Sequence, residues 1–215
     1  SPELKFQIED NDIAIAARTI RQDVMLEDML ADPKVKIQYA SKYSGSTNAW
    51  KKWQGMKLAF EKLDIIGRAE QEEAEFTAWV NANKKRQEKY GTALADLKAG
   101  IEAGREAEFA FTKAYESVYR IEITSFALSF NTATQRAINA GQDTLTALNT
   151  ALKSIAGQYG DYSVSTDRKV AKALMKHYRD IADPANYLKG LSEDFATMDI
   201  DAYVDNLFDN SAFVS

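Results

Sequence analysis

Residues 31–56 read ADPKVKIQYASKYSGSTNAWKKWQGM, and the interpretation of the whole chain starts from this stretch. Asp32-Pro33 ends a helical pattern, and because proline is tolerated in a first turn, we expect a new helix from Pro33 to about Tyr43. Gly45-Ser46-Thr47 predicts a break or a kink, with Ser46 or Thr47 as the next N-cap.

The same stretch is richer in tyrosine, tryptophan, asparagine and lysine than a plain helical core requires. Tyrosine and tryptophan combine an apolar body with a polar tip, and they are enriched at interfaces. Four aromatic rings so close together do not fit the core face of one helix comfortably. Two interpretations stay open: core packing around a kink, or an interface with another domain or with substrate. The interface candidates are Tyr39, Tyr43, Asn48, Trp50, Lys51 and Trp53.

Outside this stretch, apolar residues recur at spacings of three and four, and no window shows sustained strand alternation, so we expect an all-α fold. A first helix carries the stripe Ile13, Ala17, Ile20 and Val24. Asp10 or Asp12 is its expected N-cap, and it ends before Pro33.

Two long helices are expected in the middle of the chain. One runs from about Thr47 to Ala82, roughly 50 Å if it is unbroken. After a polar turn over Asn81–Gly91, a second begins near Leu94 and ends between Thr124 and Gly141. Helices of this length joined by a short turn should pack as an antiparallel hairpin.

The last third predicts shorter helices. Leu145, Leu148, Leu152 and Ile155 form one apolar stripe, and residues 157–165 read as a loop. Another helix includes Ala171 to Ile181 and is ended by Asp183-Pro184. A final helix covers Asp201 to Phe208. We therefore expect a single domain over residues 1–215, with an elongated body and a smaller cluster formed by both ends of the chain.

Composition excludes several classes of function. The net charge of -5 disfavours a nucleic-acid role, since phosphate binding needs clustered cations, and the basic run Lys84-Lys85-Arg86 is expected to be a solvated helix end. The chain has no cysteine, which rules out disulfides and thiolate metal sites. The sequence contains no run of about 18 apolar residues, so no membrane span is predicted.

The search for chemistry assigns no catalytic, cofactor-binding or metal-binding residue. The only histidine, His177, lies beside apolar positions and is expected to be a satisfied core or boundary side chain. No G-x-S-x-G turn is present. The carboxylates of residues 70–75 read as a solvated face, and so do those of residues 201–209. Gly100 and Gly104, four apart in a helix, are expected to permit close helix packing.

Three blocks of sequence carry a resemblance to the bacterial serine dipeptidyl peptidases of the dipeptidyl-peptidase 7 and 11 type. The first two are specific and the third is weaker. The first covers residues 20–43, including Met29-Leu30-Ala31-Asp32-Pro33 and Tyr39-Ala40-Ser41-Lys42-Tyr43; the second includes Asn48, Trp50-Lys51, Gly55-Met56 and Leu63-Asp64; the third includes Asp167-Arg168-Lys169 and Tyr203-Val204-Asp205.

The resemblance implies a helical cap inserted into a chymotrypsin-like double β-barrel. The barrel, absent from this chain, would be its partner and would carry the Ser-His-Asp triad and the groups that bind the substrate's free amine. The cap would gate peptide access to the cleft, in the periplasm or cell envelope, and a homodimer is possible. The chain alone is then expected to be inactive. The alternative is a free-standing helical interaction module. An inserted domain should leave and re-enter its host nearby, so Ser1 and Ser215 are expected to lie close together.

Overall fold

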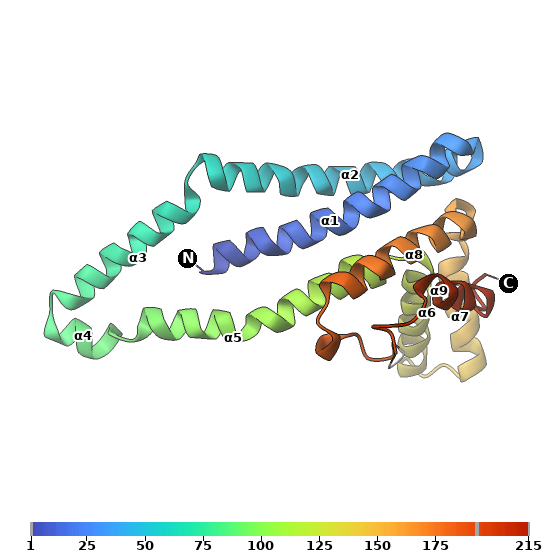
Figure 1. Cartoon of the computed structure of the whole chain (residues 1–215). Helices are drawn as coiled ribbons and strands as arrows, with labels where there is room; N and C mark the ends of the chain where they lie inside the picture. The colour runs from blue at the N-terminus through green and yellow to red at the C-terminus, as the bar shows by residue number, and fades with distance from the viewer. Residues whose placement is uncertain (1, 192–193, 215) are drawn as a thin grey trace.

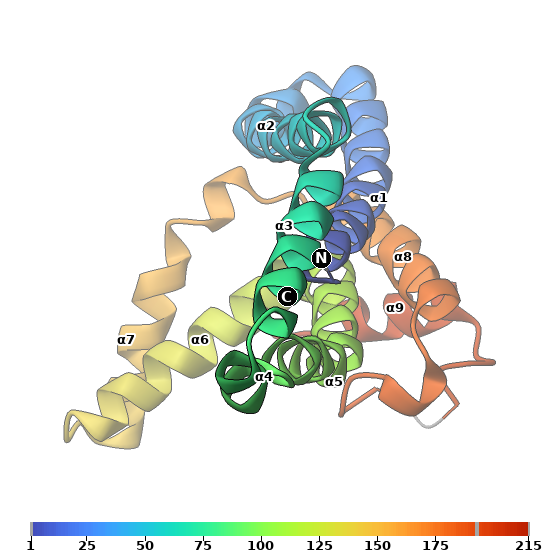
Figure 2. The same cartoon turned by 90° about the vertical axis from the view of Figure 1, so that its left-hand side faces the viewer.

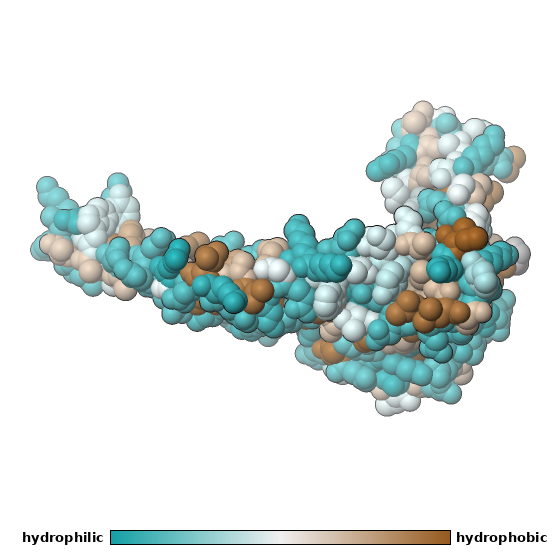
Figure 3. Space-filling view, turned by 90° about the horizontal axis from the view of Figure 1, so that it is seen from above, coloured by the Kyte–Doolittle hydropathy of each residue, from teal (hydrophilic) through white to brown (hydrophobic). Residues whose placement is uncertain are grey.

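The computed structural model describes residues 2–191 and 194–214, and every extended regular element in these ranges is a helix. Figure 1 shows an elongated molecule with a bundle of shorter helices at one end, and the space-filling view from above has the same elongated outline (Figure 3). The all-α prediction is therefore confirmed. The helices are α1 (Pro2–Ala31), α2 (Pro33–Lys62), α3 (Ile65–Asn81), α4 (Lys84–Tyr90), α5 (Ala93–Ala114), α6 (Glu122–Asn139), α7 (Thr144–Ala156), α8 (Val164–Ile181) and α9 (Ile200–Asp209).

Helices α1 and α2 form the principal long hairpin, and they turn at Asp32. The Asp32 carboxylate accepts a hydrogen bond of 2.8 Å from the backbone N–H of Lys34, and Pro33 occupies the first turn. The predicted break at Gly45-Ser46-Thr47 was wrong, because α2 continues to Lys62. Ser46 is instead buried against α1, where the Gln22 amide donates to its hydroxyl over 3.0 Å. Packing on α1 therefore outweighs the low helix propensity of this segment.

The actual bend comes at Asp64, a residue that is neither glycine nor proline. Asp64 has left-handed backbone angles (φ 48°, ψ 46°), and its carboxylate accepts from the Gly67 N–H at the start of α3. The prediction of one continuous helix over residues 47–82 was therefore wrong. The segment expected as a polar turn over 81–91 contains α4, capped by Asn83.

The predicted hairpin of two long central helices did not form. Figure 1 shows α2, α3, α4 and α5 as an open frame, with α3 and α5 diverging from the corner at α4 and with α1 running inside the frame. Among the described residues, three ion pairs join the frame to α1: Lys5–Glu70 (2.8 Å), Lys57–Asp12 (3.0 Å) and Arg105–Glu9 (2.6 Å).

The second half of the chain follows the sequence more closely. Helices α7, α8 and α9 lie where the apolar stripes placed them, and α8 ends at Ile181, just before Asp183-Pro184. Helix α5 passes through a π-helical turn, Tyr115–Tyr119, before α6 begins. Helices α6 and α7 form a second hairpin that projects from the bundle (Figure 2).

The main core lies where the turn between α1 and α2 meets α8, α9 and the π-helical turn. Its fully buried large side chains include Met25, Tyr39, Leu174, Tyr178 and Phe195. The cluster of shorter helices is thus built from the C-terminal half of the chain together with the turn between α1 and α2. The chain's N-terminal turn is not part of it.

The expectation about Ser1 and Ser215 falls on residues outside the described ranges. The neighbouring described ends, at the start of α1 and beyond α9, lie well apart along the long axis in Figure 1. The two described ends of the chain therefore do not lie side by side, as the two junctions of an inserted domain were expected to do.

A candidate functional site on helix α2

The aromatic residues of α2 face inward, on the side that meets α1. Tyr39 is fully buried, and its hydroxyl donates to the Ser163 carbonyl over 3.3 Å. Tyr43 is partly buried against the same core. The four rings are spaced by four, seven and three residues, which places them on one face of the 30-residue helix. The expectation that they would not fit one face was wrong.

Trp50 and Trp53 contact α1 directly. The Trp50 indole N–H donates to the Thr19 hydroxyl over 3.1 Å. The Arg18 guanidinium lies 4.5 Å from the centre of the Trp53 ring, a cation–π contact. Arg18 also forms a buried ion pair of 3.2 Å with Glu116 of the π-helical turn. These contacts account for both tryptophans as packing between helices.

Asn48 and Lys51 lie on the opposite, open face of α2. Both are exposed, and neither makes a side-chain hydrogen bond or ion pair to any residue in the described ranges. A Cβ added at Gly45 or Gly55, which flank them, would meet nothing within 4 Å. The six predicted residues therefore divide into two groups. Four aromatics lie on the inward face, where Trp50 and Trp53 contact α1, and two polar side chains face solvent.

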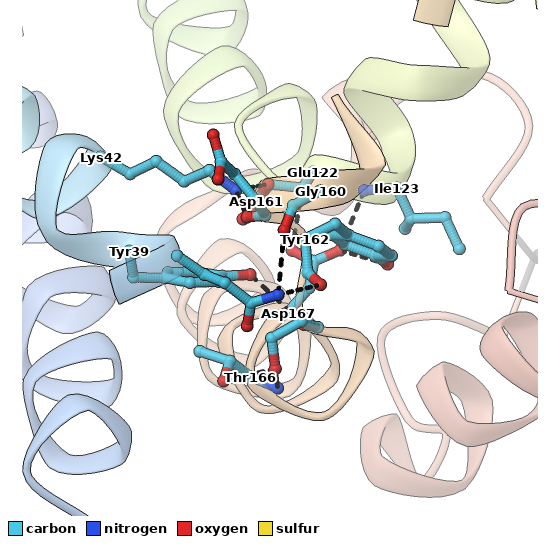
Figure 4. Close-up of polar contacts among 11 residues, drawn as sticks. Tyr39, Lys42, Glu122, Ile123, Gly160, Asp161, Tyr162, Thr166 and Asp167 are labelled. Carbon is cyan, nitrogen blue, oxygen red and sulfur yellow. Dashed lines mark hydrogen bonds and ion pairs between the residues drawn. The ribbon is translucent and has the colours of Figure 1, made fainter. Parts of the chain in front are cut away.

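A buried polar junction, which the sequence did not reveal, joins α2 to the projecting hairpin of α6 and α7. Its centre is Asp167 at the start of α8, which is 1 % exposed. The Asp167 carboxylate accepts hydrogen bonds of 2.9 Å from the backbone N–H groups of Glu122 and Ile123 and one of 3.2 Å from the Tyr162 hydroxyl (Figure 4). A side chain of α8 thereby caps α6, which has no cap of its own.

Lys42 and Gln38 complete the junction from α2. The Lys42 ammonium pairs with Glu122 at 2.5 Å and also donates to the Asp161 carbonyl (Figure 4). The Gln38 amide donates to the carbonyls of Gly160 and Tyr162, each over 3.2 Å. The segment after α7 is thus held to α2 by hydrogen bonds.

The electrostatics of this junction are dominated by burial. Burial, reinforced by the nearby Glu122 carboxylate, raises the pKa of Asp167 to about 7. Burial likewise raises the pKa values of the Tyr39 and Tyr162 hydroxyls, and it lowers that of the Arg21 guanidinium. The Asp167 carboxyl is therefore the group of this junction whose pKa lies near neutral pH.

His177 lies on α8, and its environment differs from the expectation. Burial lowers its pKa, and its Nε2 atom is buried without a hydrogen-bond partner. The expectation of a satisfied side chain was therefore wrong, although the half-buried position agrees with the predicted boundary location. No serine in the described ranges forms a hydrogen bond to His177. Within residues 2–191 and 194–214, no cluster of three acidic or histidine side chains has the geometry for a metal ion. Nor does any helix there combine the length and apolarity needed to cross a membrane.

Asp167 belongs to the weakest of the three resembling blocks, Asp167-Arg168-Lys169, and the sequence alone assigns it no role. Its signal is an aspartate within the first turn of an amphipathic helix, which ordinarily indicates a favourable interaction with that helix's own dipole. Nothing local predicts that it caps a different helix, because Glu122 lies 45 residues away.

Fold and site together define an all-helical domain in which a long hairpin is joined to a helical bundle through a buried polar junction. Comparison with known proteins identifies the class. The family model described as peptidase S46 matches residues 1–215, and the chain belongs to this family.

The relatives are dipeptidyl peptidases, and the chain corresponds to part of each. It is 33% identical over 214 residues to the dipeptidyl-peptidase 7 of Phocaeicola vulgatus, covering 94% of this chain and 29% of that protein. It is 30% identical over 219 residues to the Asp/Glu-specific dipeptidyl-peptidase of Porphyromonas gingivalis, covering 96% and 29%. The crystal structure of Porphyromonas endodontalis DPP11 in complex with the dipeptide Arg-Glu superimposes with a TM-score of 0.75 at 26% identity, over 99% of this chain and 31% of that one. The chain thus spans less than a third of the length of these proteins.

Proposed function

We propose that this chain is the helical cap domain of a serine-type dipeptidyl peptidase that releases dipeptides from the N-termini of peptides. In this proposal the cap gates access to a cleft in a catalytic β-barrel domain of the same polypeptide. The observation that carries the proposal is the extent of the match: nearly the whole chain aligns with less than a third of proteins named dipeptidyl peptidases. A location in the periplasm or cell envelope belongs to the same proposal.

The open face of α2 is the part of the cap best suited to meet the cleft. It is long, it carries Asn48 and Lys51 without partners in the described chain, and at Gly45 and Gly55 another backbone can approach closely. Glycine inside an exposed helix costs about 1 kcal/mol relative to alanine, so its presence at two such positions is better explained by a surface that is covered in the complete enzyme.

The test uses the full-length polypeptide and the release of dipeptides from a chromogenic substrate. We expect Asn48→Ala and Lys51→Ala to lower kcat/KM at least about 10-fold, which corresponds to about 1.4 kcal/mol, without lowering the unfolding temperature. Lys85→Ala, at the remote corner of the frame, is the matched control and should leave kcat/KM unchanged. Unaltered kcat/KM in both α2 variants would contradict the proposal that the open face of α2 meets the cleft.

Trp50 separates the two interpretations of the aromatic residues. Because its indole bonds to Thr19 of α1, Trp50→Ala should lower the thermal stability of the domain. If Trp50 also contributes to the interface, the full-length enzyme should lose more activity than its stability loss explains. Equal losses of stability and activity would leave Trp50 as a packing residue alone.

The size of the native polypeptide tests the parent assignment. An antibody against this chain, used to probe extracts of the source cells, should detect a band several times larger than 24.0 kDa. A band at the size of this chain would instead support the free-standing helical module.

A further inference from the structure

A groove of about 550 Å³ runs between the N-terminal half of α1 and the middle of α5, inside the frame described above. The α1 side includes Phe6, Asp10 and Asn11, and the α5 side includes Gly100, Gly104 and Phe109. Neither the resemblance nor the proposed cap function assigns anything to this groove. Its lining has three properties that point to a ligand.

The first property is a pair of buried polar atoms without partners. Asn11 is only 6 % exposed, yet its side-chain Nδ2 donates to no atom in the described structure. The neighbouring Asp10 Oδ1 is also buried and accepts no hydrogen bond. Leaving such a group unsatisfied costs about 1–3 kcal/mol, and native structures contain few of them. Adjacent residues of the lining thus carry a donor and an acceptor whose hydrogen bonds are unmade in the described structure.

The second property is charge. Three carboxylates line the groove, those of Glu3, Asp10 and Glu108, and no lysine or arginine does. None of the three forms an ion pair with any residue in the described ranges. The guanidinium of Arg105, which follows Gly104 in the chain, is bound by Glu9 at 2.6 Å. The groove is therefore a negative site without its counter-charge, and low-dielectric walls strengthen its attraction for a cation.

The third property is shape. A Cβ added at Gly100 or Gly104 would meet nothing within 4 Å, so these glycines open a trough, and the prediction that they permit close helix packing was wrong. Phe6 and Phe109 meet edge to face with ring centres 6.0 Å apart and form an apolar wall. An apolar wall beside carboxylates suits a side chain with a long aliphatic stem and a charged end.

We propose that this groove binds the side chain of a lysine or arginine residue of a peptide. The aliphatic stem lies along the Gly100–Gly104 trough against Phe109, and the cationic end pairs with the Asp10 carboxylate. The Asn11 amide donates to the carbonyl of the same residue's backbone. The proposal is independent of the cap function, because it concerns this chain alone.

The test is a titration of the 215-residue chain with Nα-acetyl-lysine amide, followed through the side-chain amide signals of ¹⁵N-labelled Asn11. The matched ligand is Nα-acetyl-norleucine amide, which keeps the aliphatic stem and lacks the charge. We expect saturable shifts with the lysine compound, at least 10-fold weaker binding of the norleucine compound, and weaker lysine binding in high salt.

Two pairs of variants connect the binding to the groove. Asp10→Asn should weaken lysine binding at least 10-fold, whereas Asp23→Asn, on an exposed position of the same helix, should not. Gly104→Leu fills the trough and should abolish binding, while Gly55→Leu makes the same change on the open face of α2 and should leave binding intact. Circular dichroism confirms that each variant is folded.

Equal affinity for the lysine and norleucine compounds would overturn the proposal, and so would unchanged lysine binding in folded Gly104→Leu. Neither result bears on the peptidase activity of the full-length protein, so failure here is distinguishable from failure of the cap function.

Discussion

Asp167 connects segments that lie far apart in the sequence, since it caps α6, accepts from Tyr162 and belongs to α8. Its raised pKa makes this connection dependent on pH. An aspartate whose pKa is higher in the folded chain than in the unfolded chain binds its proton more tightly when folded. Its contribution to stability is therefore complete below the unfolded pKa of about 4, and it is lost as pH rises through about 7.

Asp167→Asn tests this sign directly, because the amide cannot ionise. The free energy of unfolding of the variant, measured by urea titration, should improve relative to wild type by several kcal/mol between pH 4 and pH 8. The shift from 3.8 to about 7 corresponds to roughly 4 kcal/mol. The groups facing Asp167 are Glu122, Tyr162, Tyr39 and Arg21, and all are retained in the variant. A difference between variant and wild type that does not change with pH would contradict the prediction.

The pair Arg18–Glu116 is the most deeply buried ion pair in the described ranges, with side chains 9% and 6% exposed. Glu116→Gln leaves the Arg18 charge buried without a compensating carboxylate. We expect a loss of about 3 kcal/mol in the free energy of unfolding. Glu102→Gln, on an exposed pair with Arg105, is the control and should cost well under 1 kcal/mol.

The bend between α2 and α3 depends on two residues that act as one unit. A Cβ at Gly67 would lie 2.4 Å from the Asp64 carboxylate, so Gly67→Ala displaces the side chain that caps α3. Asp64→Ala removes the same cap and also places alanine at a positive φ. Each change should cost about 1–2 kcal/mol, and the double variant should cost less than their sum. Strict additivity in chemical denaturation would contradict the coupling.

The helices that the sequence placed correctly are those whose ends carry local signals. Asp183-Pro184 ends α8, and Asp143 and Asp199 cap α7 and α9 with their own carboxylates. The errors occur where distant contacts override local preference. Gly45 does not break α2 because that helix lies against α1. The bend between α2 and α3 falls on Asp64, which is neither glycine nor proline, and Gly67 leaves room for its carboxylate.

The candidate site was predictable only in part, for the same reason. The stretch from Tyr39 to Trp53 was found because its composition is unusual, and its resemblance named the family correctly. The expected break at Gly45-Ser46-Thr47 hid the common face of the four rings, because that face exists only when α2 is continuous. Asp167 and Asn11 were missed because their roles depend on segments 45 or more residues away.

The molecule is elongated because the frame of α2, α3, α4 and α5 is open, with α1 as its inner brace. The match to DPP11 extends over this frame and the bundle alike, since 99% of the chain superimposes. The two parts are stabilised differently. The bundle buries large apolar side chains, whereas much of the frame is joined to its brace by ion pairs whose members are largely accessible to water.

Because of that difference, we expect ionic strength to change the stiffness of the frame and its brace α1. Exposed ion pairs contribute about 0.2–1 kcal/mol each, and their attraction is screened over about 3 Å at 1 M salt. Small-angle X-ray scattering should record a broader range of dimensions at 1 M NaCl than at 50 mM, while the bundle keeps its unfolding temperature. Identical scattering at both concentrations would mean that apolar contacts alone hold the brace. If the frame loosens with salt and the bundle does not, the chain consists of a flexible extension, the frame with α1, attached to a rigid bundle.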